Sequence, residues 1–132
     1  MKGFLAAIIL ALGMAPSLAT PPDSPARDYS HITSREAAEA LAAKGQLFKV
    51  LLFPEEFGGE STAMNVVYVP AGIPEEKDRI TGTLVRFFEE GLIDRLTVTP
   101  EYKGKSVVPS RIVFEATYSS RDSRFEPVID IW

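Results

Sequence analysis

The longest helical pattern in the chain reads IPEEKDRITGTLVRFFEEG and covers residues 73–91. Its large apolar side chains recur at helical spacing on one face: Ile80, Leu84, Phe87 and Phe88. Pro74 suits the first turn of a helix, and Gly91 suits the position just after the last turn. Gly82 lies inside the pattern, where glycine costs about 1 kcal/mol relative to alanine, so we expect a strand to approach it closely. The stretch predicts an amphipathic helix that covers one face of a sheet.

Strand patterns precede this helix. Residues 46–53 are almost entirely apolar, and residues 64–69 are rich in β-branched and aromatic side chains. The loop between them, residues 54–61, is too short to hold a crossover helix, so we expect the two strands to pair in antiparallel fashion. Because both faces of residues 46–53 are apolar, the pattern predicts a central strand there.

After the helix, from Arg95 onward, the apolar period changes to two. Residues 102–105 are typical of a hairpin turn, and we expect the return strand to open at Val107. One face of that return strand carries Ile112, Phe114, Ala116 and Tyr118, whereas the other face is largely polar. Residues 125–132 predict a last strand, and Pro127 within it favours a position at the edge of the sheet.

A shorter helix is predicted for residues 34–44. Thr33 and Glu36 have the spacing of a capping box, in which the Thr33 hydroxyl accepts a hydrogen bond from a backbone amide three residues later. Gly45 marks the end of this helix. The elements thus follow the order α-β-β-α-β-β-β, which predicts an α+β fold. We expect a two-layer sandwich in which a mostly antiparallel sheet carries two helices on one face.

The beginning of the chain has the pattern of a cleavable signal peptide, residues 1–19, with Lys2 ahead of an apolar run at residues 4–12. As a helix that run spans about 14 Å, well short of the ~30 Å hydrocarbon core, which argues against a membrane anchor. Prolines and polar residues then predict a flexible linker at residues 20–31, followed by a single α+β domain at residues 32–132. This organisation predicts an exported protein, periplasmic or secreted.

The amino-acid composition excludes several kinds of binding and catalytic chemistry. The 132 residues include 14 Lys and Arg against 18 Asp and Glu, a net charge of −4, which is the opposite of a basic nucleic-acid-binding surface. The absence of cysteine excludes thiol catalysis, disulfides and cysteine-ligated zinc. The single histidine, His31, precedes the first helix and lacks the framing of a catalytic triad, so we expect it at the surface. The sequence predicts no metal, no cofactor and no catalytic residue.

An acidic loop carries the first candidate binding residues: Glu55, Glu56 and Phe57. Phe57 at the tip is either an exposed contact residue or a side chain that folds back over the edge of the sheet. Paired carboxylates can also act as the acid and base of a glycosidase, provided that two of them face one bond with separated pKa values. That alternative uses Glu55, Glu56 or Glu60.

A second set of candidates lies in the later part of the chain. Tyr102, Lys103 and Lys105 make the predicted hairpin mildly basic, so it can face an acidic partner. Trp132 at the end of the last strand either seals an edge of the core or anchors a partner. We therefore expect these four residues to belong to a binding surface.

Together these features predict a small exported, non-enzymatic binding domain that contacts an envelope protein or an anionic envelope polymer through its sheet face or edge. Strand addition at the same edge would allow a homodimer. An inhibitor of another enzyme is a special case of this hypothesis. The alternative is a cell-envelope glycan hydrolase that uses the loop carboxylates. A deep pocket lined by Phe53, Tyr68 or Phe114 would instead indicate a small-molecule carrier.

Overall fold

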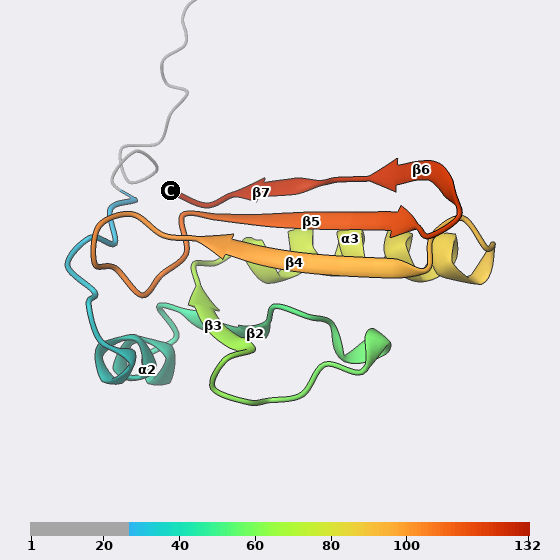
Figure 1. Cartoon of the computed structure of the whole chain (residues 1–132). Coiled ribbons are helices and arrows are strands. Elements are labelled where there is room, and N and C mark those ends of the chain that lie inside the picture. Colours follow the sequence, from blue (N-terminus) through green and yellow to red (C-terminus); the bar gives the residue numbers. More distant parts are fainter. Residues whose placement is uncertain (1–26) are drawn as a thin grey trace, which may run out of the picture.

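A computed structural model describes residues 27–132, so the predicted signal peptide and most of the predicted linker lie outside the described residues. The described part has an α+β fold with antiparallel strands, which confirms the predicted class. The elements are α2 (Arg35–Ala43), β2 (Phe48–Leu51), the short 3₁₀ helix η2 (Glu55–Phe57), β3 (Val66–Val69), α3 (Ile73–Glu89), β4 (Arg95–Glu101), β5 (Arg111–Tyr118), β6 (Arg121–Phe125) and β7 (Val128–Asp130). Figure 1 shows their arrangement.

The larger sheet has four strands, and β5 is its central strand. The strand β4 pairs along one side of β5, from Arg95 opposite Thr117 to Glu101 opposite Arg111. Both β6 and β7 pair along the other side, one after the other (Figure 1). Pro127 lies between β6 and β7, and its carbonyl accepts a hydrogen bond from the Phe114 amide at 2.9 Å. The predicted edge position of this proline is therefore confirmed.

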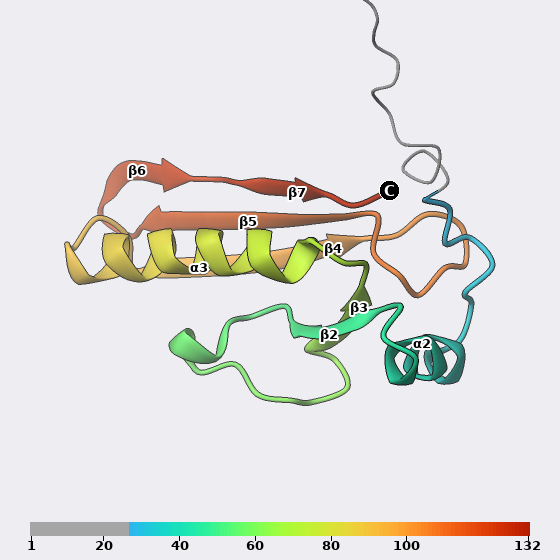
Figure 2. The same cartoon turned by 180° about the vertical axis from the view of Figure 1, so that it is seen from behind.

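Helix α3 lies across one face of this sheet, as Figure 2 shows from behind. Its end has the geometry expected of a glycine-terminated helix, because Gly91 has φ of 75°. The Leu92 amide donates to the Phe87 carbonyl at 2.9 Å, and the Gly91 amide donates to the Phe88 carbonyl at 3.1 Å. These two bonds satisfy carbonyls that the last turn would otherwise leave unpaired. The predicted helix is confirmed at both ends to within one residue.

Strands β2 and β3 form a separate two-stranded sheet, in antiparallel register from Phe48 opposite Val69 to Leu51 opposite Val66. The prediction of a central strand at residues 46–53 was wrong, because β2 pairs with β3 alone and Phe48 is 39% exposed. The apolar run has another cause: Leu47 packs into one hydrophobic cluster, whereas Leu52 packs into a second one.

The smaller cluster joins helix α2 to the rest of the domain through four buried residues: Ile32, Ala38, Leu47 and Val108. Helix α2 lies beside the two-stranded sheet, so only α3 covers the larger sheet (Figure 1). The N-cap of α2 is Ser34, whose hydroxyl accepts a hydrogen bond from the Ala37 amide at 3.1 Å. The predicted cap at Thr33 was wrong by one residue, because Ser and Thr both suit this position and stand side by side here.

The connection from β4 to β5 also differs from the predicted hairpin. Strand β5 begins at Arg111, and Val107 instead donates its amide to the Ile32 carbonyl at 2.8 Å. Pro109, fully buried, has no amide hydrogen to give to a strand ladder. The Ser106 hydroxyl donates to the Tyr29 carbonyl at 2.7 Å, so the loop holds the segment just before α2. The packed domain therefore includes Tyr29.

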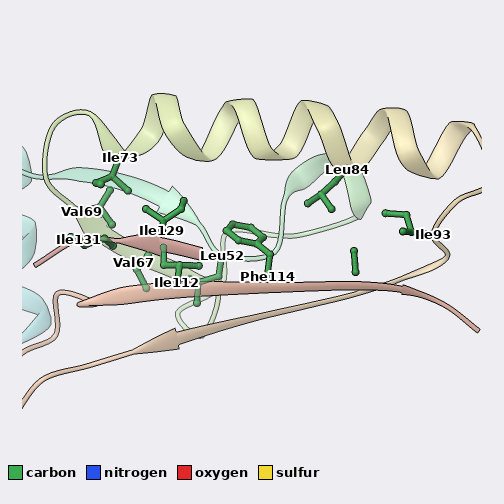
Figure 3. Packing of buried hydrophobic residues seen from close by; sticks show 11 residues of the cluster. Leu52, Val67, Val69, Ile73, Leu84, Ile93, Ile112, Phe114, Ile129 and Ile131 are labelled. Carbon is green, nitrogen blue, oxygen red and sulfur yellow. The ribbon is translucent and has the colours of Figure 1, made fainter. Parts of the chain in front are cut away.

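The main core lies between α3, the larger sheet and the two-stranded sheet (Figure 3). Ile73 and Leu84 point from the helix toward Ile112 and Phe114 on β5, and residues of the smaller sheet close the side between them. The fully buried residues of the main core include Val69, Leu84, Ile112, Phe114, Ala116 and Ile129. The alternation predicted for β5 is confirmed, since residues 112, 114 and 116 are all fully buried.

Gly82 is exposed, and no heavy atom outside its own helix lies within 4 Å of the place where a Cβ would stand. The expected close approach of a strand is therefore wrong. Replacing Gly82 by alanine should raise the free energy of unfolding by about 1 kcal/mol, because alanine loses less backbone freedom in a helix. Urea denaturation measures this directly. A loss of stability in Gly82→Ala would show that a neighbour does contact this position.

Candidate functional site

The loop between β2 and β3 is held in shape by one side chain. Asn65 accepts from the Phe53 amide at 2.7 Å through its carboxamide oxygen. The Asn65 amide nitrogen donates to the carbonyls of Phe53 and Glu60, each at 3.0 Å. The side chain thus mimics a neighbouring strand and satisfies backbone groups on both sides of the loop.

The two adjacent glycines of this loop serve different geometric needs. Gly58 has φ of 96°, a conformation that costs other residues free energy. A Cβ at Gly59 would stand 1.9 Å from the Phe53 carbonyl oxygen, so only glycine fits against that backbone. The Gly59 amide also donates to the Pro54 carbonyl at 2.9 Å. The loop is therefore a defined turn that presents η2 at its tip.

Phe57 at this tip folds back onto the domain, which agrees with the second of the two positions predicted for it. Its ring meets Phe53 edge-on at a centroid distance of 6.4 Å and Phe88 of α3 edge-on at 5.9 Å. Edge-to-face contacts of this kind are favourable and directional. They fix the separation between the loop and the last turns of α3.

A groove of about 560 Å³ opens where the loop, the end of α3 and the start of β4 meet. Its apolar walls come from all three elements: Phe53, Phe57, Val85, Phe88, Ile93 and Leu96. Phe88 is 54% exposed, which is unusual for so large an apolar side chain. A concave surface with aromatic walls is the usual form of a small-molecule site.

The charged side chains around the groove are mostly acidic. Glu56, Glu89 and Asp94 border it together with a single cation, Arg95. The Ser119 hydroxyl donates to the Asp94 carboxylate at 2.6 Å, and the Ser119 amide donates to it at 2.8 Å. These hydrogen bonds, led by that of the hydroxyl, hold the pKa of Asp94 below its ordinary value. The rim is thus negative at neutral pH.

The three loop carboxylates do not all border one cavity. Glu56 borders both the groove and a neighbouring cavity. Glu55 borders the neighbouring cavity but not the groove, and Glu60 borders neither. All three side chains belong to exposed residues. A glycosidase general acid is usually held in a buried, apolar environment, which these three exposed positions do not provide.

The other predicted site residues lie at the opposite end of the domain, where the 102–110 loop and the C-terminus meet (Figure 1). Trp132 is half-buried there: its indole nitrogen donates to the Val108 carbonyl at 3.1 Å, and Tyr29 packs edge-on at 5.9 Å. The Lys103 ammonium lies 5.0 Å from the centroid of the Trp132 ring. Trp132 therefore seals the core, as one of its predicted roles required. Lys105 is exposed.

Tyr102 borders a smaller cavity of about 290 Å³ together with Arg35 and Tyr68. Partial burial raises the pKa of Tyr102, while Arg35 acts in the opposite direction. The Arg35 guanidinium donates to the Ala63 carbonyl at 2.8 Å and lies 5.9 Å from the centroid of the Tyr68 ring. These contacts tie Arg35 to the domain, and the volume of this cavity is about half that of the groove.

Phe88 was predicted to belong to the core-facing stripe of α3, but it borders the groove instead. Adjacent residues on a helix point about 100° apart, so Phe87 and Phe88 cannot share one narrow stripe. Phe87 packs inward on Phe125 with a centroid distance of 5.2 Å, and Phe88 points toward the loop. The doublet of aromatic residues was the available signal.

His31 is exposed, as expected from the sequence. Within residues 27–132, no group of three or more histidine or acidic side chains is placed to hold a metal ion. In the same residues, no helix combines the length and the apolar character needed to cross a bilayer. Comparison of the chain with protein-family models, with curated proteins and with solved structures finds no significant match.

Proposed function

We propose that the protein is an exported, periplasmic or secreted, non-enzymatic binding protein and that the groove is its binding site. The observation that carries this proposal is the exposed Phe88 ring, which packs edge-on against Phe57 at the wall of a concavity of about 560 Å³. The loop that forms one wall is fixed by the hydrogen bonds of Asn65, so the groove exists before a ligand arrives. Export is supported by the signal-peptide pattern of residues 1–19.

The groove favours a small molecule with an apolar body and a positively charged group. Sites for such ligands span about 300–1,000 Å³, and this groove falls within that range. The aromatic walls suit the apolar body. Three carboxylates against one guanidinium attract a cation and disfavour an anion, most strongly at low ionic strength.

Other binding surfaces have less support. The outer face of the larger sheet is polar and ion-paired: Arg111 meets Asp130 at 2.9 Å, and Arg124 meets Glu115 at 3.5 Å. The edges of the sheet carry proline, at Pro100 in β4 and beside β7, which weakens strand addition or edge-to-edge dimerisation. An anionic polymer would rely on Lys103 and Lys105, and Lys103 already lies over the Trp132 ring.

Three probes with one phenylbutyl body test the charge preference: 4-phenylbutylamine, 4-phenylbutanol and 4-phenylbutyrate. We expect the amine to bind about tenfold more tightly than the carboxylate at low salt, with the alcohol between them, and the difference to shrink at 0.5 M salt. Nuclear magnetic resonance titration of the labelled protein gives the three dissociation constants. Equal affinity of all three, or preference for the carboxylate, would refute the charge assignment.

Phe88→Ala should weaken the binding of 4-phenylbutylamine about tenfold, since burying an aromatic side chain against a ligand contributes roughly 1.5 kcal/mol. Because Phe88 is 54% exposed in the free protein and its removal loses mainly the edge-on contact with Phe57, we expect the free energy of unfolding to fall by only about 1 kcal/mol. Met64→Ala is the matched control, since Met64 lies in the same loop region, is 92% exposed and does not border the groove. Unchanged affinity in Phe88→Ala would place the binding site elsewhere.

A further inference from the structure

Lys77 is the only charged residue that is buried among those the structure describes, with 6% of its surface exposed. It belongs to the inward stripe of α3, where helical spacing aligns it with Ile73, Thr81 and Leu84. Its ammonium lies 5.9 Å from the centroid of the Phe114 ring on β5. A lysine at a core-facing position of this kind is rare unless it is paired.

The structure gives Lys77 no such pair. Within residues 27–132 its ammonium has neither a hydrogen bond nor an ion pair with another residue. In the same residues, every fully buried polar side-chain atom has a hydrogen-bond partner. The Lys77 nitrogen therefore cannot be fully buried, and it must reach open space.

That space is a cavity of about 320 Å³ between β2, η2 and α3. Besides Lys77, its charged lining residues are Lys49 of β2, Glu55 and Glu56 of η2, and Asp78 of α3. Three carboxylates against one other ammonium make the cavity unfavourable for an anion. A small neutral ligand meets no such repulsion.

Burial lowers the pKa of Lys77, while Glu56 and Asp78 act in the opposite direction. A larger fraction of this amine is therefore uncharged near neutral pH than of an exposed lysine. The uncharged form is the nucleophile, and desolvated lysines are the ones that proteins use for attack on carbonyl groups.

We propose that this cavity is a covalent binding site in which the Lys77 amine captures a small aldehyde as an imine. The nitrogen lone pair attacks the carbonyl carbon, and the carbonyl π pair moves to oxygen. A first proton passes from nitrogen to that oxygen and gives a carbinolamine. A second proton from nitrogen then lets the oxygen leave as water while the nitrogen lone pair forms the carbon–nitrogen double bond. One amine and one aldehyde thus give one imine and one water, with no change of oxidation state. The volume of about 320 Å³ lies at the lower end of the range for small-molecule sites, so the aldehyde must be small.

Trapping with butanal and cyanoborohydride tests this proposal at pH 7.5, because reduction converts the imine into a stable alkylamine that peptide mass mapping locates. We expect Lys77 to be modified about fivefold or more faster than the exposed Lys44 and Lys49. The advantage should shrink toward pH 10, where exposed lysines also lose their proton. A merely structural buried lysine would react more slowly than the exposed ones at every pH, and that result would overturn the proposal.

Two variants make the test specific. Lys77→Met removes the amine while keeping an unbranched apolar stem, and it should abolish the fast modification without loss of folding. Lys49→Arg changes the other lysine of the same cavity and should leave the fast modification of Lys77 intact. If another residue of Lys77→Met is still modified as fast as Lys77 is in the parent protein, that result would also overturn the proposal. Lys77 does not border the groove, so binding of 4-phenylbutylamine should be retained in Lys77→Met and reports separately on the proposed function.

Discussion

Replacing Phe114 by alanine is expected to lower the free energy of unfolding by about 3–5 kcal/mol. Phe114 is fully buried at the centre of β5, with α3 above it and the smaller sheet beside it (Figure 3). Its removal loses apolar burial and leaves a cavity that fixed secondary structure on three sides cannot fill. It also removes the ring that lies against the Lys77 ammonium. Domains of this size have a total stability of roughly 5–15 kcal/mol, so this variant should lose a large fraction of that stability and unfold at a clearly lower urea concentration.

Val113→Ala is the matched control, because Val113 is the neighbour of Phe114 on the opposite, partly exposed face of β5. Its cost should be below about 1 kcal/mol. Urea denaturation followed by circular dichroism measures both variants. Since a shift of one residue in register exchanges the two faces of a strand, an equal or larger loss in Val113→Ala would contradict the packing of α3 on this side of the sheet.

Gly59→Ala is expected to be the second most damaging change, with a loss of about 3 kcal/mol or more. The added methyl group would stand 1.9 Å from the Phe53 carbonyl oxygen and 2.9 Å from that of Pro54. Both atoms belong to the backbone, so the loop must open to admit it. Opening removes Phe57 from Phe88, and the variant should lose 4-phenylbutylamine binding as well as stability.

Gly58→Ala separates this steric effect from backbone strain. A Cβ at Gly58 meets nothing within 4 Å, but φ of 96° disfavours any residue except glycine. We therefore expect a loss of about 1–2 kcal/mol, smaller than that of Gly59→Ala. Thermal unfolding of the two variants side by side gives the comparison. If Gly59→Ala is as stable as the parent protein, the close approach of the two backbone segments does not exist.

The parts of the fold that could be predicted are those in which local pattern and tertiary burial agree. Helix α3 has both its apolar stripe and its end at Gly91, and β5 alternates between buried and more exposed residues from Arg111 to Ala116. The class follows from these two elements, since an amphipathic helix and a half-buried sheet can cover one another. Such patterns extend over many residues, so no single tertiary contact outweighs them.

The errors arise where one local pattern fits two tertiary arrangements. The run from Leu47 to Leu52 reads as a central strand, but its two ends contact different clusters. Ser34 and Thr33 are both good caps, and spacing alone chose the wrong one. The predicted strand start at Val107 failed because that amide meets the Ile32 carbonyl of a distant segment.

The candidate site could be predicted only in part. Glu56 and Phe57 do border the groove, but the residues of α3 and β4 that face them lie about 30–40 positions later in the chain. No local signal reports such a meeting. The two predicted sets of binding residues lie at opposite ends of the domain: Glu56 and Phe57 border the groove, whereas Tyr102, Lys103 and Trp132 lie near the C-terminus.

The most direct test of the central claim, that the groove binds the ligand, is the location of chemical-shift changes when methyl-labelled protein is titrated with 4-phenylbutylamine. The methyl groups of Val85, Ile93 and Leu96, which line the groove, should move together along one saturation curve, while Val128 on the far face stays fixed. Changes that gather instead around Trp132 and Val107, or that never saturate, would contradict it.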